Sequence, residues 1–579
     1  MNRIHCLIVI LAGLACLALR ASAQDDALPP VPLFQPRNAE LGLPYPLPDE
    51  PSVALLDFNR DGHVDLIVGR QMWRNDGRRR FSSAYRLPGP YYSFGDFNND
   101  GKLDIYVTSP VDHAQAKGVN FDHWLLRCDG DGRYTDILKD SGLPTAGEPP
   151  SPYDPYPKYD NLSKAHGFLD YDNDGNLDLF VAGHVTSRGK GVQKRIQALP
   201  DQLYRGDGQG KFVDVTQQAG LVATPRQAVG LAFCDFDLDG FVDIYVANAN
   251  LTSNSLWHNQ GDGTFVDIAE PVGACGGAAS SFSVVCVDFD HDGDFDIFLV
   301  NHAAATREKE EPRSVLLRNE FIPEGQLRFT DVTAELGLDW APPAGFRPQA
   351  MWVSAAWADF NNSGYHDLFV TESCDGGYNH PEIPLDLGRL DSGYSKLFVN
   401  NQNRRFVRAD TARNNLRIED SWGCAAADID NDGWLDLLVG SNTVRKDSKV
   451  TWFDPRKQRA VFLHNRGLSA ATAQPPGPQQ RYLNVTITAH DRALTGTVVE
   501  AILDDGERRR ALLDTSFGGY ATGSNQLHFG LADRRVTEII AHFPGRDTVS
   551  FKGNWQNTTL LVDVSRDDRQ PPETVSRWE

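Results

Sequence analysis

One nine-residue pattern returns seven times along this chain of 579 residues. Asp or Asn stands at positions 1, 3, 5 and 9 in nearly every copy, Gly stands at position 6, and a short apolar run follows. The copies that start at Asp57 and Asp170, for example, read DFNRDGHVD and DYDNDGNLD. Successive copies start between 39 and 74 residues apart. This spacing predicts an array of similar structural units separated by inserts of variable length.

The pattern has the chemistry of a calcium-binding loop. Ca²⁺ takes about six to eight hard oxygen ligands, and alternate side chains of a tight loop converge on one point. The Gly permits the sharp turn that a Cβ would resist, and position 7 would add its backbone carbonyl. We therefore predict six or seven Ca²⁺ ions. The predicted ligands are Asp57, Asn59, Asp61, His63, Asp65, Asp96, Asn98, Asp100, Lys102, Asp104, Asp170, Asp172, Asp174, Asn176, Asp178, Asp235, Asp237, Asp239, Phe241, Asp243, Asp288, Asp290, Asp292, Asp294, Asp296, Asp359, Asn361, Ser363, Tyr365, Asp367, Asp428, Asp430, Asp432, Trp434 and Asp436.

The residues around each loop separate it from an EF-hand, which needs helices on both sides and a Glu at position 12. Position 12 is Val or Leu in all seven copies and lies in runs such as LIVG and IYVA. Such runs are typical of strands. The repeated unit is therefore predicted to be strand, acidic loop, strand. The sixth loop carries Ser363 at position 5, so we expect it to bind calcium more weakly than the others.

A hairpin follows most units, as in LYRGDGQGKFVDVT at residues 203–216, and completes four strands per unit. Four-stranded repeats of this length predict an all-β chain whose main part is a seven-bladed β-propeller. The seventh unit lacks an obvious fourth strand, whereas residues 33–43 resemble the fourth strand of other units, such as residues 212–221. We therefore expect the N-terminal segment to complete the last blade and close the ring.

Composition changes predict the boundaries between the parts of the chain. The first residues have a positive start, an apolar core and an Ala-Ser-Ala ending, which indicates a signal for export. A Pro/Gln-rich stretch follows the last repeat, and alternating segments beyond it predict a small β-sandwich. The predicted parts are a signal peptide at 1–23, a propeller at 24–472, a linker at 473–480, a sandwich domain at 481–565 and a disordered tail at 566–579.

The repeats resemble the FG-GAP/VCBS class found in integrin α-subunit propellers, and the C-terminal segment resembles the ASPIC/UnbV domain. The DxDxDG loops, the hairpins and the late NQLHFGL segment at residues 525–531 carry the resemblance. The combination is similar to the cartilage acidic protein family, with its bacterial members. The resemblance implies an integrin-like propeller that binds calcium at one face and ligands at the opposite face. It implies no reaction.

Composition also limits the partners. The net charge is −22, and the loop positions hold 24 of the 78 acidic residues, so the acidity belongs to the ion sites. The chain shows no basic stripe, which argues against nucleic acid. An exported chain with six cysteines after the predicted cleavage site has fifteen possible connectivities; Cys275 with Cys286 is the first candidate disulfide. We expect a secreted, periplasmic or cell-surface monomer.

Two functions from different classes are compatible with these features, and a purely structural surface protein is a third possibility. The first is a non-catalytic adhesion module in which calcium is structural and variable loops bind a protein or a glycan. The tyrosine-rich insert SPYDPYPKYD at residues 151–160 is one candidate surface. The alternative is an exported enzyme that uses His166, His184, His302 and Glu372 at the mouth of the propeller channel, with His166 facing His184 across a strand pair. No nucleophile elbow, phosphate loop or HExxH spacing supports catalysis, so the first function is favoured.

Overall fold

The computed structural model describes most of the chain. The described residues are 30–37, 40–43, 52–109, 122–130, 132–145, 165–183, 185–188, 195–198, 200–221, 226–249, 252–277, 279–302, 313–339, 352–373, 394–409, 415–416, 418, 420–441, 460–468, 480–489, 494–518, 521–565 and 571–577. The predicted signal peptide, residues 473–479 of the predicted linker and the tyrosine-rich insert lie outside these ranges.

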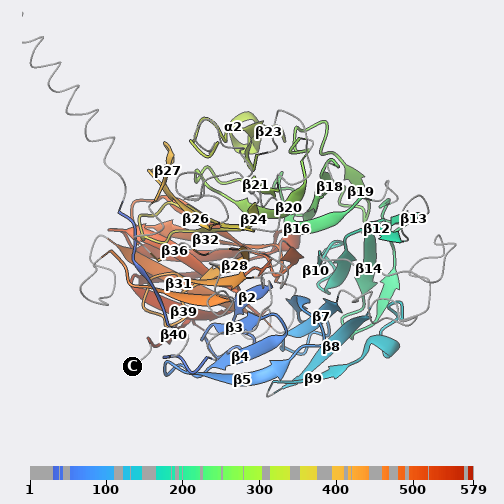
Figure 1. The fold of residues 1–579 in the computed structure, drawn as a ribbon, viewed down its shortest axis with the longest axis horizontal. Helices are drawn as coiled ribbons and strands as arrows, with labels where there is room; N and C mark the ends of the chain where they lie inside the picture. Colours follow the sequence, from blue (N-terminus) through green and yellow to red (C-terminus); the bar gives the residue numbers. More distant parts are fainter. Residues whose placement is uncertain are drawn as a thin grey trace, which may run out of the picture.

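Seven four-stranded antiparallel units surround a common axis among the described residues, which makes this part of the chain a β-propeller (Figure 1). We call each unit a blade. The first three blades are β2 (Val53–Leu56), β3 (Asp65–Val68), β4 (Gln71–Asn75) and β5 (Phe81–Arg86); β6 (Tyr91–Gly95), β7 (Asp104–Ser109), β8 (Asp122–Gly130) and β9 (Arg133–Asp136); and β10 (His166–Leu169), β11 (Asp178–Val181), β14 (Gln202–Gly206) and β15 (Phe212–Asp214).

The other four blades have the same strand order. They are β16 (Ala228–Cys234), β17 (Asp243–Asn248), β18 (Ser255–Asn259) and β19 (Phe265–Asp267); β20 (Ser281–Val287), β21 (Asp296–Asn301), β22 (Val315–Asn319) and β23 (Phe329–Asp331); β24 (Trp352–Ala358), β25 (Asp367–Glu372), β26 (Lys396–Asn400) and β27 (Phe406–Arg408); and β28 (Ser421–Ala427), β29 (Asp436–Ser441), β30 (Val461–Asn465) and β1 (Phe34–Pro36). A separate hairpin, β12 (Val185–Arg188) with β13 (Arg195–Ala198), extends from the third blade.

Each blade depends on its neighbours for a hydrophobic core. The second strand is buried along its whole length, as in β17 and β21, because blades pack against both of its faces. One cluster joins the third and fourth blades, where the rings of Phe180 and Phe233 meet edge to face at 6.4 Å. A single blade cannot bury both of its faces, so the repeats are stable only as an array.

The N-terminal strand closes the ring, as the sequence predicts. Strand β1 pairs antiparallel with β30, so that Phe34 lies opposite Asn465. The side chain of Phe34 is fully buried and contacts the ring of Phe360 in the sixth blade. Strand β1 thus takes the outer, fourth position of the last blade, the place that β15 takes in the third blade.

Two further sheets form the C-terminal part. One cluster of buried side chains, with Leu483, Val499, Ile539 and Leu560 among its members, lies between them, as expected for a sandwich. The sheets are β36 (Gln526–Ala532), β31 (Arg481–Thr488), β39 (Thr558–Asp563) and β40 (Glu573–Val575); and β33 (Arg508–Leu513), β32 (Thr497–Leu503), β37 (Val536–His542) and β38 (Thr548–Trp555).

The predicted disordered tail needs a correction. Residues Glu573–Val575 form an edge strand that pairs with β39. A Cβ added at Gly62 in the first acidic loop would lie 2.6 Å from Val575 Cγ2, so the tail also contacts the propeller. The tail composition favours disorder only for an isolated segment, and here a sheet edge supplies partners for its backbone.

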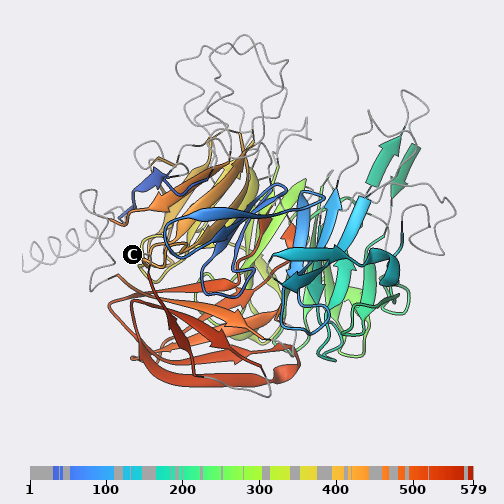
Figure 2. The same ribbon diagram turned by 90° about the horizontal axis from the view of Figure 1, so that it is seen from below.

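The sandwich covers the face of the propeller that carries the acidic loops (Figure 2). The backbone N–H of Asp57 donates to Asn525 Oδ1 at 2.8 Å, and that of Asp428 donates to Gln526 Oε1 at 3.0 Å. On the other side of the ring, Gly545 N donates to Gly240 O at 2.8 Å. The two parts of the chain are therefore tightly docked.

A short segment of the sandwich continues into the propeller axis. Strand β34 (Phe517–Gly518) pairs with β10 through His166, and β35 (Ala521–Thr522) runs parallel to β2. These strands join the first and third blades into one ten-stranded sheet. A Cβ at Gly518 would lie 2.5 Å from the backbone nitrogen of Leu231, which explains the glycine.

Two other observations concern the described residues. Cys275 and Cys286 are both free thiols, so the candidate disulfide between them is wrong. None of the described helices has the length and apolar character of a membrane span; they are the short turns η1 (Leu138–Asp140), α2 (Phe321–Glu324) and η4 (Pro544–Arg546).

Ring closure generates the first prediction. Phe34→Ala should lower the free energy of unfolding by about 3–5 kcal/mol, because it leaves a cavity where β1 seals the last blade. Chemical denaturation of the purified full-length chain measures the change. Phe34→Leu, which keeps most of the volume, should cost clearly less. Equal stability of Phe34→Ala and the parent chain would show that closure by β1 is unimportant.

Candidate metal centre

The acidic loops connect the first and second strands of every blade, and all seven turn in the same way. The residue at position 4 takes a left-handed backbone conformation in each loop, with φ between 54° and 64°, and the Gly at position 6 follows with φ between 83° and 107°. Asn, which tolerates this conformation, occupies position 4 in four of the seven loops. The double turn brings positions 1, 3, 5 and 9 together.

The position-1 carboxylate holds the turn from inside. In the first loop, Asp57 accepts from the backbone N–H groups of Asp61 at 3.1 Å and Gly62 at 2.7 Å. The same pair of bonds recurs at Asp96, Asp170, Asp235, Asp359 and Asp428. One side chain thus satisfies two backbone donors that the tight turn leaves without partners.

The position-9 carboxylate joins the loop to the third strand. In the third blade, Asp178 Oδ2 accepts from Tyr171 N at 3.0 Å and its Oδ1 accepts from Gly206 N on β14 at 2.8 Å. In every other blade a backbone N–H of the third strand likewise donates to the position-9 carboxylate. The acceptors are Asp65, Asp104, Asp243, Asp296, Asp367 and Asp436. These seven aspartates are nearly fully buried. They hold each blade together as well as closing its loop.

The loops fit a bound cation. Several buried carboxylate oxygens have no hydrogen-bond partner among the described residues: Asp104 Oδ2, Asp172 Oδ1, Asp288 Oδ1, Asp294 Oδ1, Asp367 Oδ2 and Asp430 Oδ1. Burial, followed by the charge of Asp61, raises the pKa of Asp57 to about 7. Burial and the charges of Asp290 and Asp292 raise the pKa of Asp288 to about 8. Carboxylates that repel one another in a buried site favour the binding of a metal ion between them.

Groups of side chains that could hold a metal ion coincide with the predicted loops. They include Asp170, Asp172 and Asp178 in the third blade, and Asp288, Asp290 and Asp296 in the fifth. Within each group the nearest ligand atoms lie within 4.8 Å of one another. The roles of the individual ligands, including the backbone carbonyls at position 7, stay predictions.

Two histidines of these clusters are absent from the sequence prediction. His258 joins Asp237 and Asp243, and His464 joins Asp430 and Asp432. Both lie on third strands, one residue before the Asn that ends the strand. The equivalent positions of the other blades hold Arg74, Arg127, Arg205, Arg318 and Val399. The repeat register identifies this position as one that faces the loop, but a single histidine gives no motif.

The two histidines differ in their electrostatics. The hydrogen bond to Asp243 raises the pKa of His258 to about 9. Burial, together with the charges of Arg37 and Arg466, lowers the pKa of His464 to about 3. His258 therefore replaces an arginine as a cation, whereas His464 is a neutral imidazole.

At the opposite end of the channel, the described histidines of the predicted site have partners other than those predicted. His166 pairs with Val181 rather than with His184, because the strand register sets Leu169 opposite Asp178. Its Nδ1 lies 2.8 Å from Ser93 Oγ and its Nε2 lies 3.3 Å from Thr108 Oγ1. His184 lies outside the described residues.

The other two members have separate partners. Glu372 forms a buried ion pair with Lys396, and His302 stacks on Phe282 at 4.5 Å. His166, His302 and Glu372 are all buried, and each has neighbours of its own. These contacts support structural roles for all three residues.

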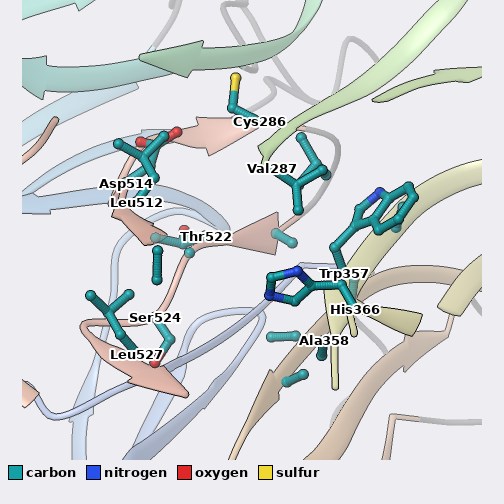
Figure 3. A pocket seen from close by; sticks show the side chains of 18 of the residues that line it. Cys286, Val287, Trp357, Ala358, His366, Leu512, Asp514, Thr522, Ser524 and Leu527 are labelled. Atoms are coloured by element: carbon teal, nitrogen blue, oxygen red, sulfur yellow. The ribbon is translucent and has the colours of Figure 1, made fainter. Parts of the chain in front are cut away.

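A cavity of about 260 Å³ lies between the blades and the inserted segment (Figure 3). Its walls come from the fourth to seventh blades and from the sandwich. They include Cys286, Trp357 and His366 on one side and Thr522 and Ser524 on the other. The cavity lies beside the loops, since Asp288 and Asp359 also line it.

Comparison with known proteins agrees with this geometry. The model of the FG-GAP-like repeat family matches residues 57–107, 170–246, 235–299 and 385–439. Cartilage acidic protein 1 of Mus musculus is 24% identical over 316 residues, which cover 52% of this chain and 46% of that protein. Cartilage acidic protein 1 of Xenopus tropicalis is 27% identical over 314 residues, with coverages of 50% and 42%. The match thus spans less than half the length of these relatives.

Two solved structures are similar at low sequence identity. An Agrocybe aegerita lectin that recognises non-reducing terminal N-acetylglucosamine is 15% identical, with a TM-score of 0.33 over 70% of this chain and 88% of the lectin. An exotype rhamnogalacturonan lyase is 12% identical, with a TM-score of 0.32 over 86% of this chain and 81% of the lyase.

A propeller whose blades each begin with a strand, an acidic DxDxDG loop and a second strand is an FG-GAP repeat propeller. The matched residues carry FG-GAP-like repeats, and the chain is similar over about half of its length to the cartilage acidic proteins.

The two roles of loop carboxylates can be separated by substitution. Asp178→Asn should destabilise the chain by about 3 kcal/mol even in chelator, because an amide cannot accept from both backbone donors. Asp174→Asn, at the exposed position 5 of the same loop, should be nearly neutral in chelator and lower only the stabilisation by calcium. Urea unfolding with and without calcium measures both variants. Identical profiles for the two variants would contradict the division of roles.

The raised carboxylate pKa values predict an unusual pH dependence of the free energy of unfolding. In chelator, the folded loops still hold protons that the unfolded chain, with carboxyl pKa values near 3.8, has released. The free energy of unfolding should therefore fall as pH rises from about 5 to 8. A bound cation removes this fall, because the folded loops are then ionised. Melting temperatures at several pH values, with calcium and with chelator, test it. Parallel pH profiles under the two conditions would contradict the prediction.

Proposed function

We propose that this chain is an exported calcium-binding propeller that acts as an adhesion module for a protein or a glycan, with calcium in a structural role. The observation that carries the proposal is the set of buried carboxylate oxygens without partners in loops of one repeated geometry. These are hard oxygen ligands, the kind that Ca²⁺ prefers. The export signal in the first residues supports an environment where calcium is abundant.

The docking of the sandwich supports a binding site on the opposite face of the propeller. The sandwich contacts six of the seven acidic loops through bonds or close approaches of Ala489, Asn525, Gln526, His528, Arg510 and Gly545. A ligand therefore meets the opposite face. Four long inserts, at 110–121, 303–312, 374–393 and 442–459, begin where the second strands of their blades end on that face.

Calcium contributes to stability in this proposal because only the folded loops bring the ligands together. A site saturated 100-fold above its dissociation constant adds about 2.7 kcal/mol to the free energy of unfolding. Several such sites, one in each blade that binds an ion, stiffen the ring. The inserts can then vary without loss of the scaffold.

Metal removal tests the calcium role directly. Elemental analysis of the dialysed full-length chain should find six or seven calcium ions, and chelation should lower the melting temperature by many degrees. The sixth loop, with Ser363, should release its ion first. A chain without calcium, or an unchanged melting temperature after chelation, would refute the calcium role.

Ligand binding is tested with arrays of glycans and of extracellular proteins, probed with the calcium-loaded chain. We expect binding that is lost when residues 376–391 are replaced by a short Gly/Ser linker and kept in Asp174→Asn at saturating calcium. Binding that survives removal of each of the four long inserts would place the ligand elsewhere and overturn the assignment of the face.

A further inference from the structure

The seventh acidic loop has a mixed nitrogen and oxygen ligand set. His464 on β30 lies inside the loop, with its Nε2 3.0 Å from Asp430 Oδ2 and its Nδ1 3.9 Å from Asp436 Oδ1. Ligand atoms of Asp430, Asp432 and His464 lie within 4.8 Å of one another. The imidazole thus faces the carboxylates of positions 3 and 9.

Two polar atoms of this group lack the partners that burial demands. His464 is 3% exposed, yet its Nδ1 has no hydrogen-bond partner among the described residues. Asp430 is 7% exposed, and its Oδ1 is likewise without a partner. Buried polar atoms are nearly always satisfied by protein, water or an ion. Both atoms point to an additional group in the loop.

The C-terminal part of the chain closes this loop. Asn484 Nδ2 donates to Asp428 Oδ2 at 2.7 Å, and Arg577 approaches Asp432 Oδ2 at 3.5 Å. As a result, Asp428 and Asp432 are buried as well. Arg577 offsets part of the negative charge, and the burial excludes competing water.

Comparison with the equivalent third-strand positions distinguishes this loop. Arginine, found in four blades, is always protonated and cannot ligate a metal, and Val399 offers no ligand. His258 in the fourth blade keeps 21% of its side chain exposed and directs its Nδ1 to Asp243 Oδ1 at 3.0 Å. His464 alone among these seven residues combines a ring nitrogen with deep burial.

We propose that Asp430, Asp432 and His464 bind a first-row divalent transition ion, Zn²⁺ or Mn²⁺, in the seventh loop. Imidazole nitrogen is a poor ligand for Ca²⁺ and a good one for Zn²⁺, while the carboxylates suit Mn²⁺ as well. The proposal goes beyond the calcium role of the other loops and does not depend on it.

The test uses the full-length chain, stripped with chelator and reloaded with Zn²⁺ or with Mn²⁺ in excess calcium. After dialysis against calcium buffer, the parent chain should retain one equivalent of the transition ion, as measured by elemental analysis. His464→Arg, which installs the residue of four other blades, should lower its affinity at least tenfold. His258→Arg is the matched control and should leave it unchanged.

Retention of the ion by His464→Arg, or its complete displacement by calcium from the parent chain, would overturn the proposal. If His464→Arg fails to fold, X-ray absorption at the zinc edge of the parent chain decides, because it detects an imidazole in the coordination shell. A shell of oxygen alone overturns the proposal. Calcium content is measured in the same samples, so failure of the calcium role is seen separately.

Discussion

The structure depends on one buried aspartate per blade, at the last position of the acidic loop. In five of the seven blades, its two oxygens accept backbone hydrogens from the start of the loop and from the third strand, as Asp178 does from Tyr171 and Gly206. There, one carboxylate fixes the loop, the second strand and the third strand relative to one another. The same carboxylate lies beside the other acidic side chains of its loop, so the contact that holds the blade together also concentrates the negative charge that favours a cation.

The docking of the sandwich explains a sequence motif that otherwise has no visible purpose. In NQLHFGL, Asn525 and Gln526 bond to the first and seventh loops, and His528 Nε2 lies 2.8 Å from Asn362 Oδ1 in the sixth. A Cβ at Gly530 would lie 1.8 Å from Asp359 Oδ2. The polar and small residues Asn525, Gln526, His528 and Gly530 of the motif thus contact acidic loops, while its apolar residues, such as Phe529, enter the sandwich core. The acidic loops lie at the interface between the two parts of the chain.

The sequence predicts most of the propeller because its signals are local. A strand, a loop and a second strand lie within about twenty residues, and the closing strand at Phe34 copies the pattern of other blades. The predicted pairing of His166 with His184 is wrong because the two were placed by strand position alone, and Glu372, from the same predicted group, pairs with Lys396. The ordered strand in the tail was missed because its partner, β39, satisfies a backbone whose own side chains favour disorder.

By itself, the sequence determined the loop geometry, the strand order within a blade and the ligand types, since all of these depend on residues within one repeat. Only the tertiary structure decided which face is covered, what fills the axis and which loop acquires a histidine. Those features join residues hundreds of positions apart, such as Asp57 with Asn525. Such contacts depend on the shape of two folded surfaces and not on local spacing, so no periodic pattern in the sequence predicts them.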